Sequence, residues 1–255
     1  MGMIAGSVMG TYIGMLGGTD PAAKVLFATH LLSASVMAVP GSIVLAKMLC
    51  PQTEEATDHV AISGKEKENS NILDAISSGT VTGVKLMTNI AAMLLVFISL
   101  VALANYITEG VIGRYTGLND WIVKITDGKA QGLTFQFILG VITSPFMWLI
   151  GVPSQDIMLV GSLLGQKTIL NEFVAYFQLQ QWKDAGLFMY EKSILMSTYI
   201  LCGFANISSI GILLGGLGVL APEKRGLISR IGVPAMIGGA LVSVLSATII
   251  GMILG

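Results

Sequence analysis

The hydrophobic and polar positions of the chain divide it into long apolar runs separated by shorter polar stretches. Apolar runs over 24–49, 85–107 and 228–254 reach the length of about 20 residues that a helix needs to cross a bilayer. The run over 1–18 is already apolar at its first residue and lies near the lower limit of that length, which is typical of half of a broken helix. The pattern predicts an all-α polytopic membrane protein.

The stretches between these runs are more polar. Residues 50–70 contain most of the charge and are predicted to form an aqueous loop. Ile72, Ile76 and Val84 are apolar with polar residues between them, which predicts a short interfacial helix over 72–84. Residues 108–131 are polar and include Trp121, a residue type enriched at membrane interfaces.

Two further apolar regions are interrupted. The region 137–182 consists of pieces too short to span, split by Pro145, by 151–153 and by 161–167, which favours a re-entrant hairpin. The region 192–218 contains "GFANIS" at 203–208, a composition that sustains a helix poorly in hydrocarbon. We interpret it as a broken span, since unwound backbone in a membrane is tolerated where it lines a cavity or contacts protein.

A faint internal repeat links the two ends of the chain. A glycine- and serine-bearing segment precedes "MAVPGSIVLA" in the first half, and another precedes "IGVPAMIGGALV" in the second. Duplicated broken helices are typical of inverted-repeat secondary transporters, whose site lies between the halves. The first half would then be cut short at its beginning, which indicates a fragment.

Composition agrees with a membrane protein and excludes several other classes. The chain is 53% hydrophobic and 11% charged, with a mean hydropathy of +0.78, whereas soluble domains are roughly one quarter charged. Its net charge of −1 gives no basic face for nucleic acid. His30 and His59 have no partner at metal-ligand spacing, no catalytic motif of an enzyme is present, and Cys50 and Cys202 are expected to be buried without a disulfide.

Glu172 is the first candidate for a binding residue, because it follows Asn171 inside an apolar piece. A carboxylate at membrane depth costs several kcal/mol unless it is paired, hydrated or facing a cavity. One interpretation is an ion pair with Lys167 or Lys192 or an interfacial position. The other is a ligand contact, in which two acceptor oxygens suit a group with two hydroxyls, such as a sugar diol.

The polar residues of the broken span are the second candidate group. Asn206 offers a donor and an acceptor, and the Ser208 and Ser209 hydroxyls can serve as either. They indicate a binding site, although small residues and serines also pack helices together in membranes. Phe204 could stack on a planar ring or simply pack.

The loop before the last span indicates the topology. Lys224, Arg225 and Arg230 outnumber one acidic residue there, and positive residues in short loops favour the cytoplasm. This places Gly255 outside.

Four segments carry a resemblance to a known family: "IAGSVMGTYI", "LLSASVMAVPGSIVLAKML", "GQKTILNEFVAY" and "CGFANISSIGILLGGLG". They resemble the C-terminal part of the transport unit of concentrative nucleoside transporters, and the likeness covers nearly all of the chain. The early spans and a first hairpin that contacts the nucleobase lie outside it. The choice between purine and pyrimidine therefore stays open.

The resemblance implies roles for particular residues. Glu172 would bind the ribose hydroxyls, Asn206 and Ser209 would line the ribose side, Phe204 would lie at the substrate, and Val8 would neighbour the base. A sodium site would involve the backbone near Ile4. The family usually has serine or threonine where this chain has Met3, so coupling to protons is an alternative to coupling to sodium.

The same resemblance implies ion-coupled nucleoside uptake by alternating access, without a cofactor. It implies a homotrimer in the plasma membrane, or in the inner membrane of a bacterium, in contact with lipid. Two alternatives stay open at this point. One is an inactive truncated fragment of such a transporter, and the other is a channel-type membrane protein, which would favour rings of identical groups.

Overall fold

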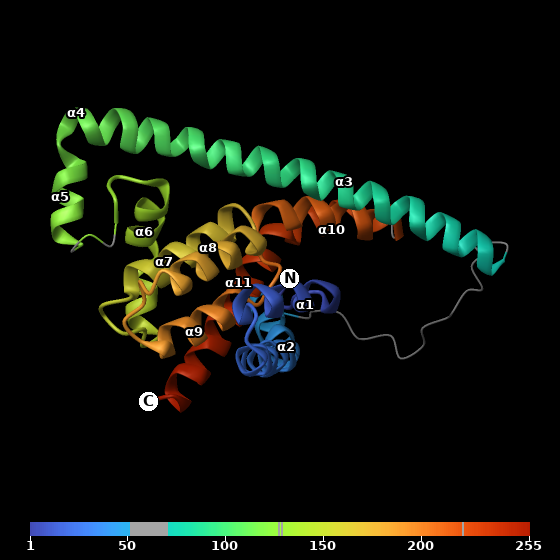
Figure 1. The fold of residues 1–255 in the computed structure, drawn as a ribbon. Coiled ribbons are helices and arrows are strands. Elements are labelled where there is room, and N and C mark those ends of the chain that lie inside the picture. Colours follow the sequence, from blue (N-terminus) through green and yellow to red (C-terminus); the bar gives the residue numbers. More distant parts are fainter. Residues whose placement is uncertain (52–70, 127, 129, 221) are drawn as a thin grey trace. The chain divides into compact units, whose positions relative to one another are not determined.

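The computed structural model describes residues 1–51, 71–126, 128, 130–220 and 222–255, and every regular element in these ranges is helical (Figure 1). The chain divides into two units. One comprises Met1–Pro51 and Asn105–Gly255, and the other comprises Gln52–Ala104. The predicted aqueous loop over 50–70 lies almost entirely outside the described residues.

The described residues of the smaller unit are helical from Ile72 onward. Helix α3 runs from Ile72 to Asn105 without a break. The prediction of a separate interfacial helix over 72–84 before the span 85–107 is therefore wrong. No proline lies between Ile72 and Asn105, and isolated glycines such as Gly79 and Gly83 each weaken a helix by only about 1 kcal/mol.

The larger unit contains the remaining helices. They are α1 (Gly6–Gly17), α2 (Pro21–Leu49), η1 (Tyr106–Gly113), α4 (Arg114–Thr116), α5 (Leu118–Ile125), α6 (Phe135–Leu149), α7 (Ile157–Ile169), α8 (Glu172–Asp184), α9 (Glu191–Leu201), α10 (Ile207–Leu220), η2 (Pro222–Lys224) and α11 (Arg225–Ile253). The polar stretch 108–131 thus contains helices η1, α4 and α5.

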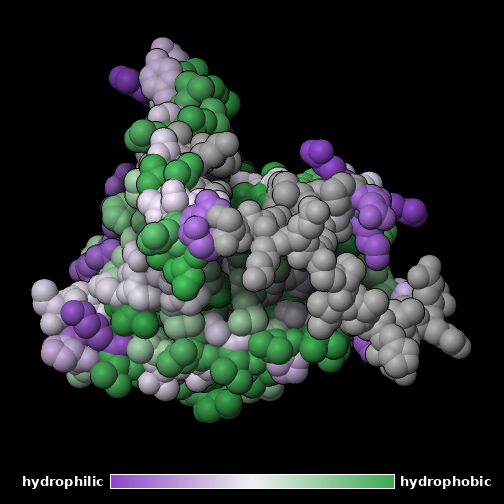
Figure 2. All heavy atoms as spheres, turned by 90° about the vertical axis from the view of Figure 1, so that its right-hand side faces the viewer, coloured by the Kyte–Doolittle hydropathy of each residue, from purple (hydrophilic) through white to green (hydrophobic). Residues whose placement is uncertain are grey.

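Helices α2 and α11 are long and apolar enough to cross a membrane, judged by length and composition among the described residues. Helix α2 begins where the Asp20 carboxylate accepts a hydrogen bond from the Ala22 amide at 2.9 Å, with Pro21 at the first helical position. Apolar side chains such as Val36 and Met48 on α2 are 70% exposed. Figure 2 shows hydrophobic residues over much of the visible surface, with hydrophilic residues in a few groups.

The region 137–182 forms helices α6, α7 and α8, which are separated at 150–156 and 170–171. Pro145 lies inside α6 and 161–167 lies inside α7, so the breaks predicted at these two places are wrong. The glycines allow close packing: a Cβ atom at Gly165 would lie 2.6 Å from the Leu139 Cβ atom, and one at Gly140 would lie 2.8 Å from the Met158 carbonyl oxygen.

The core of the larger unit joins α1, α2, α6, α7, α8, α9 and α11. Its largest fully buried members include Tyr12, Leu31, Leu163, Tyr176 and Met196. Cys202 is buried as predicted, but Cys50 is exposed because it stands just beyond the end of α2. This core fixes the ends of α7, α8 and α9 relative to one another.

Candidate functional site

The chain leaves helical form between α9 and α10, over residues 202–206. Asn206 starts α10, because its side-chain oxygen accepts hydrogen bonds from the Ser209 amide and the Ser208 hydroxyl, each at 2.7 Å. The Asn206 amide in turn donates to the Ser209 hydroxyl oxygen at 3.3 Å. This reciprocal pairing is the geometry of a capping box, and it fixes the Asn206 side chain.

Helix α8 starts in the same way. The Asn171 side-chain oxygen accepts a hydrogen bond from the Val174 amide at 2.9 Å, and Glu172 is the first helical residue. The N-terminus of a helix carries partial positive charge, so it stabilises a carboxylate there. The local sequence thus makes a buried anion tolerable at the start of α8.

The two helix starts meet through their side chains. Asn206 Nδ2 donates a hydrogen bond to Glu172 Oε2 at 2.9 Å. Glu172 is 7% exposed, and Asn206 and Ser209 are fully buried. An ionised carboxylate can accept about four hydrogen bonds, so this bond leaves acceptor capacity for another partner. The structure therefore brings together three of the residues singled out in the sequence.

Helix α1 contributes a tyrosine that the sequence analysis missed. The Tyr12 ring stacks on Tyr176 with centroids 4.1 Å apart, and it lies 6.4 Å from the Phe173 ring. Its buried hydroxyl has no hydrogen-bond partner of ordinary geometry among the described residues, although it interacts electrostatically with Glu172. The Tyr12 hydroxyl therefore lies at the Glu172 carboxylate, and a small adjustment of either side chain would let it donate to that carboxylate.

Val8 and Phe204, the two apolar residues expected at the substrate, are both half-buried. Val8 lies one helical turn before Tyr12 on α1 and packs against the core. Phe204 lies in the break, where its amide donates to the Met3 carbonyl oxygen at 3.3 Å. This bond joins the break to the segment before α1, where Ile4 is 6% exposed.

Lys167 does not pair with Glu172. Its ammonium group instead donates to the Ile200 carbonyl oxygen at 2.7 Å and to the Ser243 hydroxyl oxygen at 2.9 Å. Neither Lys167 nor Lys192 forms an ion pair with Glu172 in the described part of the chain, so the ion-pair interpretation of Glu172 is wrong. The sequence pointed to Lys167 only as a possible partner of Glu172 and gave no sign of its contacts with Ile200 and Ser243.

The histidine and cysteine residues form no metal site in the ranges that the structure describes. His30 Nδ1 lies 3.1 Å from the Tyr199 hydroxyl oxygen, and the two rings pack edge to face. His30 therefore belongs to the packing of α2 against α9.

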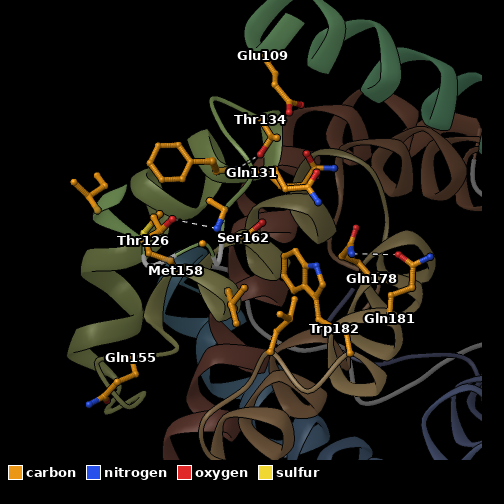
Figure 3. A pocket seen from close by; sticks show the side chains of 18 of the residues that line it. Glu109, Thr126, Gln131, Thr134, Gln155, Met158, Ser162, Gln178, Gln181 and Trp182 are labelled. Atoms are coloured by element: carbon orange, nitrogen blue, oxygen red, sulfur yellow. Dashed lines mark hydrogen bonds between the residues drawn. The ribbon is translucent and has the colours of Figure 1, made fainter. Parts of the chain in front are cut away.

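A separate cavity of about 720 Å³ lies at the opposite ends of α7 and α8 (Figure 3). Its polar side chains are mostly amides and hydroxyls, and Glu109 is the one charged side chain among the described residues that line it. Gln178 Nε2 donates to Gln181 Oε1 at 3.3 Å along its wall, beside Trp182. None of the site residues expected from the sequence lines it.

Comparison with known proteins gives one family. Residues 30–251 match the model described as the Na+ dependent nucleoside transporter C-terminus. A protein of Haemophilus influenzae named as an uncharacterized transporter is 39% identical over 255 residues, which cover 99% of this chain and 56% of that protein. Rat sodium/nucleoside cotransporter 1 is 37% identical over 98% of this chain, but the match covers 37% of that protein. The chain thus spans about half or less of the length of these relatives.

Solved structures give the same result. CNTnw in an inward-facing substrate-bound state matches 98% of this chain at 35% identity with a TM-score of 0.79, over 54% of that chain. A variant of CNTnw in an outward-facing state matches 98% of this chain with a TM-score of 0.82 at 35% identity, over 55% of that chain.

Proposed function

Because this chain belongs to the C-terminal region of the concentrative nucleoside transporter family, a family of membrane transporters and not of enzymes, we propose that it supplies the ribose-binding part of a nucleoside uptake system. The observation that carries the proposal is the buried contact between Glu172 and Asn206 at the starts of two helices. Burying such a pair costs free energy, so its presence indicates that the pair either binds a ligand or stabilises the fold.

The chemistry of this pair suits a ribose. Vicinal hydroxyls donate two hydrogen bonds, and the Glu172 carboxylate retains acceptor positions for both. Asn206 orients the carboxylate, and its second Nδ2 hydrogen can donate to a ribose hydroxyl, because its side-chain oxygen already accepts two hydrogen bonds. Ser209 bonds to the backbone of Asn206, with its hydroxyl donating to the Asn206 carbonyl oxygen at 2.6 Å. Its role in the proposal is to hold Asn206 while lining the ribose side.

Apolar residues around the pair suit the rest of a nucleoside. Phe204 lies two residues before Asn206, and Val8 lies one turn before Tyr12. We assign both to the base side, where a planar ring packs well against apolar side chains. The Tyr12 hydroxyl, which interacts with Glu172, supplies a further polar atom at the carboxylate.

The mechanism that we propose is alternating access by an inverted-repeat transporter. The α7–α8 turn would be the inner end of a re-entrant hairpin, and the α9–α10 break would be the fixed binding segment. Uptake into the cell would be coupled to sodium, with the backbone near Ile4 contributing to its site, or to protons. The proposal includes a homotrimer in the plasma membrane.

The test is uptake of labelled uridine and adenosine by cells without their own nucleoside transporters. The cells would express the chain from its complete gene, and Glu172→Ala would be compared with Glu191→Ala, which changes an exposed glutamate at the start of α9. We expect uptake by the parent and Glu191→Ala, and at least a tenfold loss in Glu172→Ala. Absence of uptake by a parent protein that reaches the membrane would contradict the proposal.

A further inference from the structure

Lys167 is fully buried, yet it forms no ion pair with a carboxylate among the described residues. It lies in the last turn of α7, and its ammonium group reaches the Ile200 carbonyl oxygen of α9 at 2.7 Å and the Ser243 hydroxyl oxygen of α11 at 2.9 Å. Burying an ammonium group without partners costs many kcal/mol. The oxygens around it must therefore offset its desolvation.

The Ile200 carbonyl oxygen belongs to the buried C-terminal end of α9, just before the break. The last carbonyl groups of any helix have no partner within it, and they carry partial negative charge. At the end of α9 the Tyr176 hydroxyl donates to the Thr198 carbonyl oxygen at 2.8 Å. The Lys167 ammonium group donates to the Ile200 carbonyl oxygen. The Ser243 hydroxyl lies 3.2 Å from the Cys202 carbonyl oxygen and can donate to it. Side chains from α8, α7 and α11 thus contact alternate carbonyl groups of this helix end, while the carbonyl oxygens of Tyr199 and Leu201 accept from backbone amides.

The space around the ammonium group depends on a glycine. A Cβ atom at Gly203 would lie 2.6 Å from the Ser243 hydroxyl oxygen and 3.3 Å from Lys167 Nζ. Any larger residue at 203 would displace the hydroxyl that binds the ammonium group. The carbonyl oxygen of Ile200 and the hydroxyl oxygen of Ser243 are of the kinds that coordinate monovalent cations, and here both bind the Lys167 ammonium group.

Each partner in the contact between Lys167 and Ile200 lies a few residues before one partner in the contact between Glu172 and Asn206. Lys167 precedes Glu172 by five residues, and Ile200 precedes Asn206 by six. The α7–α8 turn is therefore attached to the α9–α10 break at two points, one between Lys167 and Ile200 and the other between Glu172 and Asn206.

We infer that Lys167 is a positioning residue: its ammonium group fills a monovalent-cation site at the end of α9 and holds the Glu172 carboxylate in register with Asn206. The effect on nucleoside affinity rests on the function proposed above. The cation site itself does not, so it can be tested without a nucleoside.

The test is chemical rescue of Lys167→Ala. This substitution removes three methylene groups and the ammonium group, which n-propylammonium restores in volume and charge. The parent, Lys167→Ala and the control Lys124→Ala, which changes an exposed lysine on α5, would be purified from the complete gene in detergent. The thermal unfolding temperature and the uridine affinity of each would be measured with n-propylammonium, with the uncharged 1-propanol, and with neither.

We expect Lys167→Ala to unfold at a lower temperature than the parent and to bind uridine at least tenfold more weakly. n-Propylammonium should recover part of both losses, while 1-propanol should not, and Lys124→Ala should match the parent under every condition. Parent-like behaviour of Lys167→Ala, recovery with neither compound, or equal recovery with both would overturn the inference. If the parent binds no uridine, the proposed function fails, and the unfolding temperatures still decide the cation site.

Ser243→Ala is the second variant if Lys167→Ala does not fold. It keeps the ammonium group but removes one of its two oxygen partners. The loss of one hydrogen bond to a charged group predicts a uridine affinity at least about tenfold weaker and a lower unfolding temperature. Parent-like values for both would overturn the inference.

Discussion

Asn206→Asp tests the contact between the two helix starts with an almost isosteric change. The aspartate keeps the oxygen that caps α10 by accepting from the Ser209 amide at 2.7 Å. It loses the donor that Asn206 presents to Glu172 Oε2 at 2.9 Å. The start of α10 should therefore survive while its bond to α8 is lost.

The magnitude follows from that bond. A hydrogen bond to a charged group is worth about 1.5–3 kcal/mol, which corresponds to roughly 10- to 150-fold in affinity. Two ionised carboxylates with oxygens at the 2.9 Å of the original bond would also repel each other by about 6 kcal/mol at an effective dielectric constant of 20. The pair would relieve this by moving apart or by binding a proton, and either response removes the arrangement that accepts two hydroxyls. We therefore expect at least a tenfold loss of nucleoside affinity.

The assay is uridine binding to the purified complete protein by calorimetry, beside thermal unfolding to verify the fold. Asn171→Asp is the matched control, because it makes the same change at the cap of α8, where the side-chain oxygen accepts from the Val174 amide. The control should stay within a few-fold of the parent. A folded Asn206→Asp protein that binds uridine as tightly as the parent would refute the reasoning.

Three further predictions follow from other parts of the chain. Cysteines introduced at Lys224 and Arg225 should resist a membrane-impermeant thiol reagent in intact cells, since this basic loop is predicted to face the cytoplasm; labelling from outside would reverse the topology. Uptake should respond to a proton gradient and depend weakly on sodium, because Met3 offers no hydroxyl; steep sodium dependence at fixed pH would count against this. Gly203→Ala should destabilise the protein by about 1–3 kcal/mol, since its Cβ atom would lie 2.6 Å from the Ser243 hydroxyl oxygen; an unchanged unfolding temperature would show that the site adapts.

Much of the helical framework could be predicted from apolar periodicity and length. The run over 24–49 lies within α2, and all but the last residue of the run over 228–254 lies within α11. The composition of 203–208 marked the region where α9 and α10 are separated. The sequence did not predict that the helices continue through Pro145 and through 161–167. Glycine and proline in apolar segments occur at close helix contacts as well as at helix ends. The course of the backbone through them depends on the neighbouring helices.

The candidate site was predictable only in part. Glu172, Asn206 and Ser209 stood out because polar groups are costly in an apolar segment, and the structure links them by hydrogen bonds. Tyr12 and Lys167 did not stand out in these roles. A tyrosine in an apolar run usually packs, and the partners of Lys167 are a backbone carbonyl group and a serine far away in the chain.

The central claim is that Glu172 binds the ribose hydroxyls, and Glu172→Gln tests it most directly. Glutamine keeps the shape of the side chain but removes the charge and turns one acceptor into a donor. Affinities for uridine, 2′-deoxyuridine and 3′-deoxyuridine would be measured for the parent and for Glu172→Gln. We predict at least a tenfold loss for uridine, about 1.4 kcal/mol, and a smaller loss for each deoxynucleoside, which already lacks one partner. A folded Glu172→Gln protein with unchanged affinities for all three nucleosides would contradict the account.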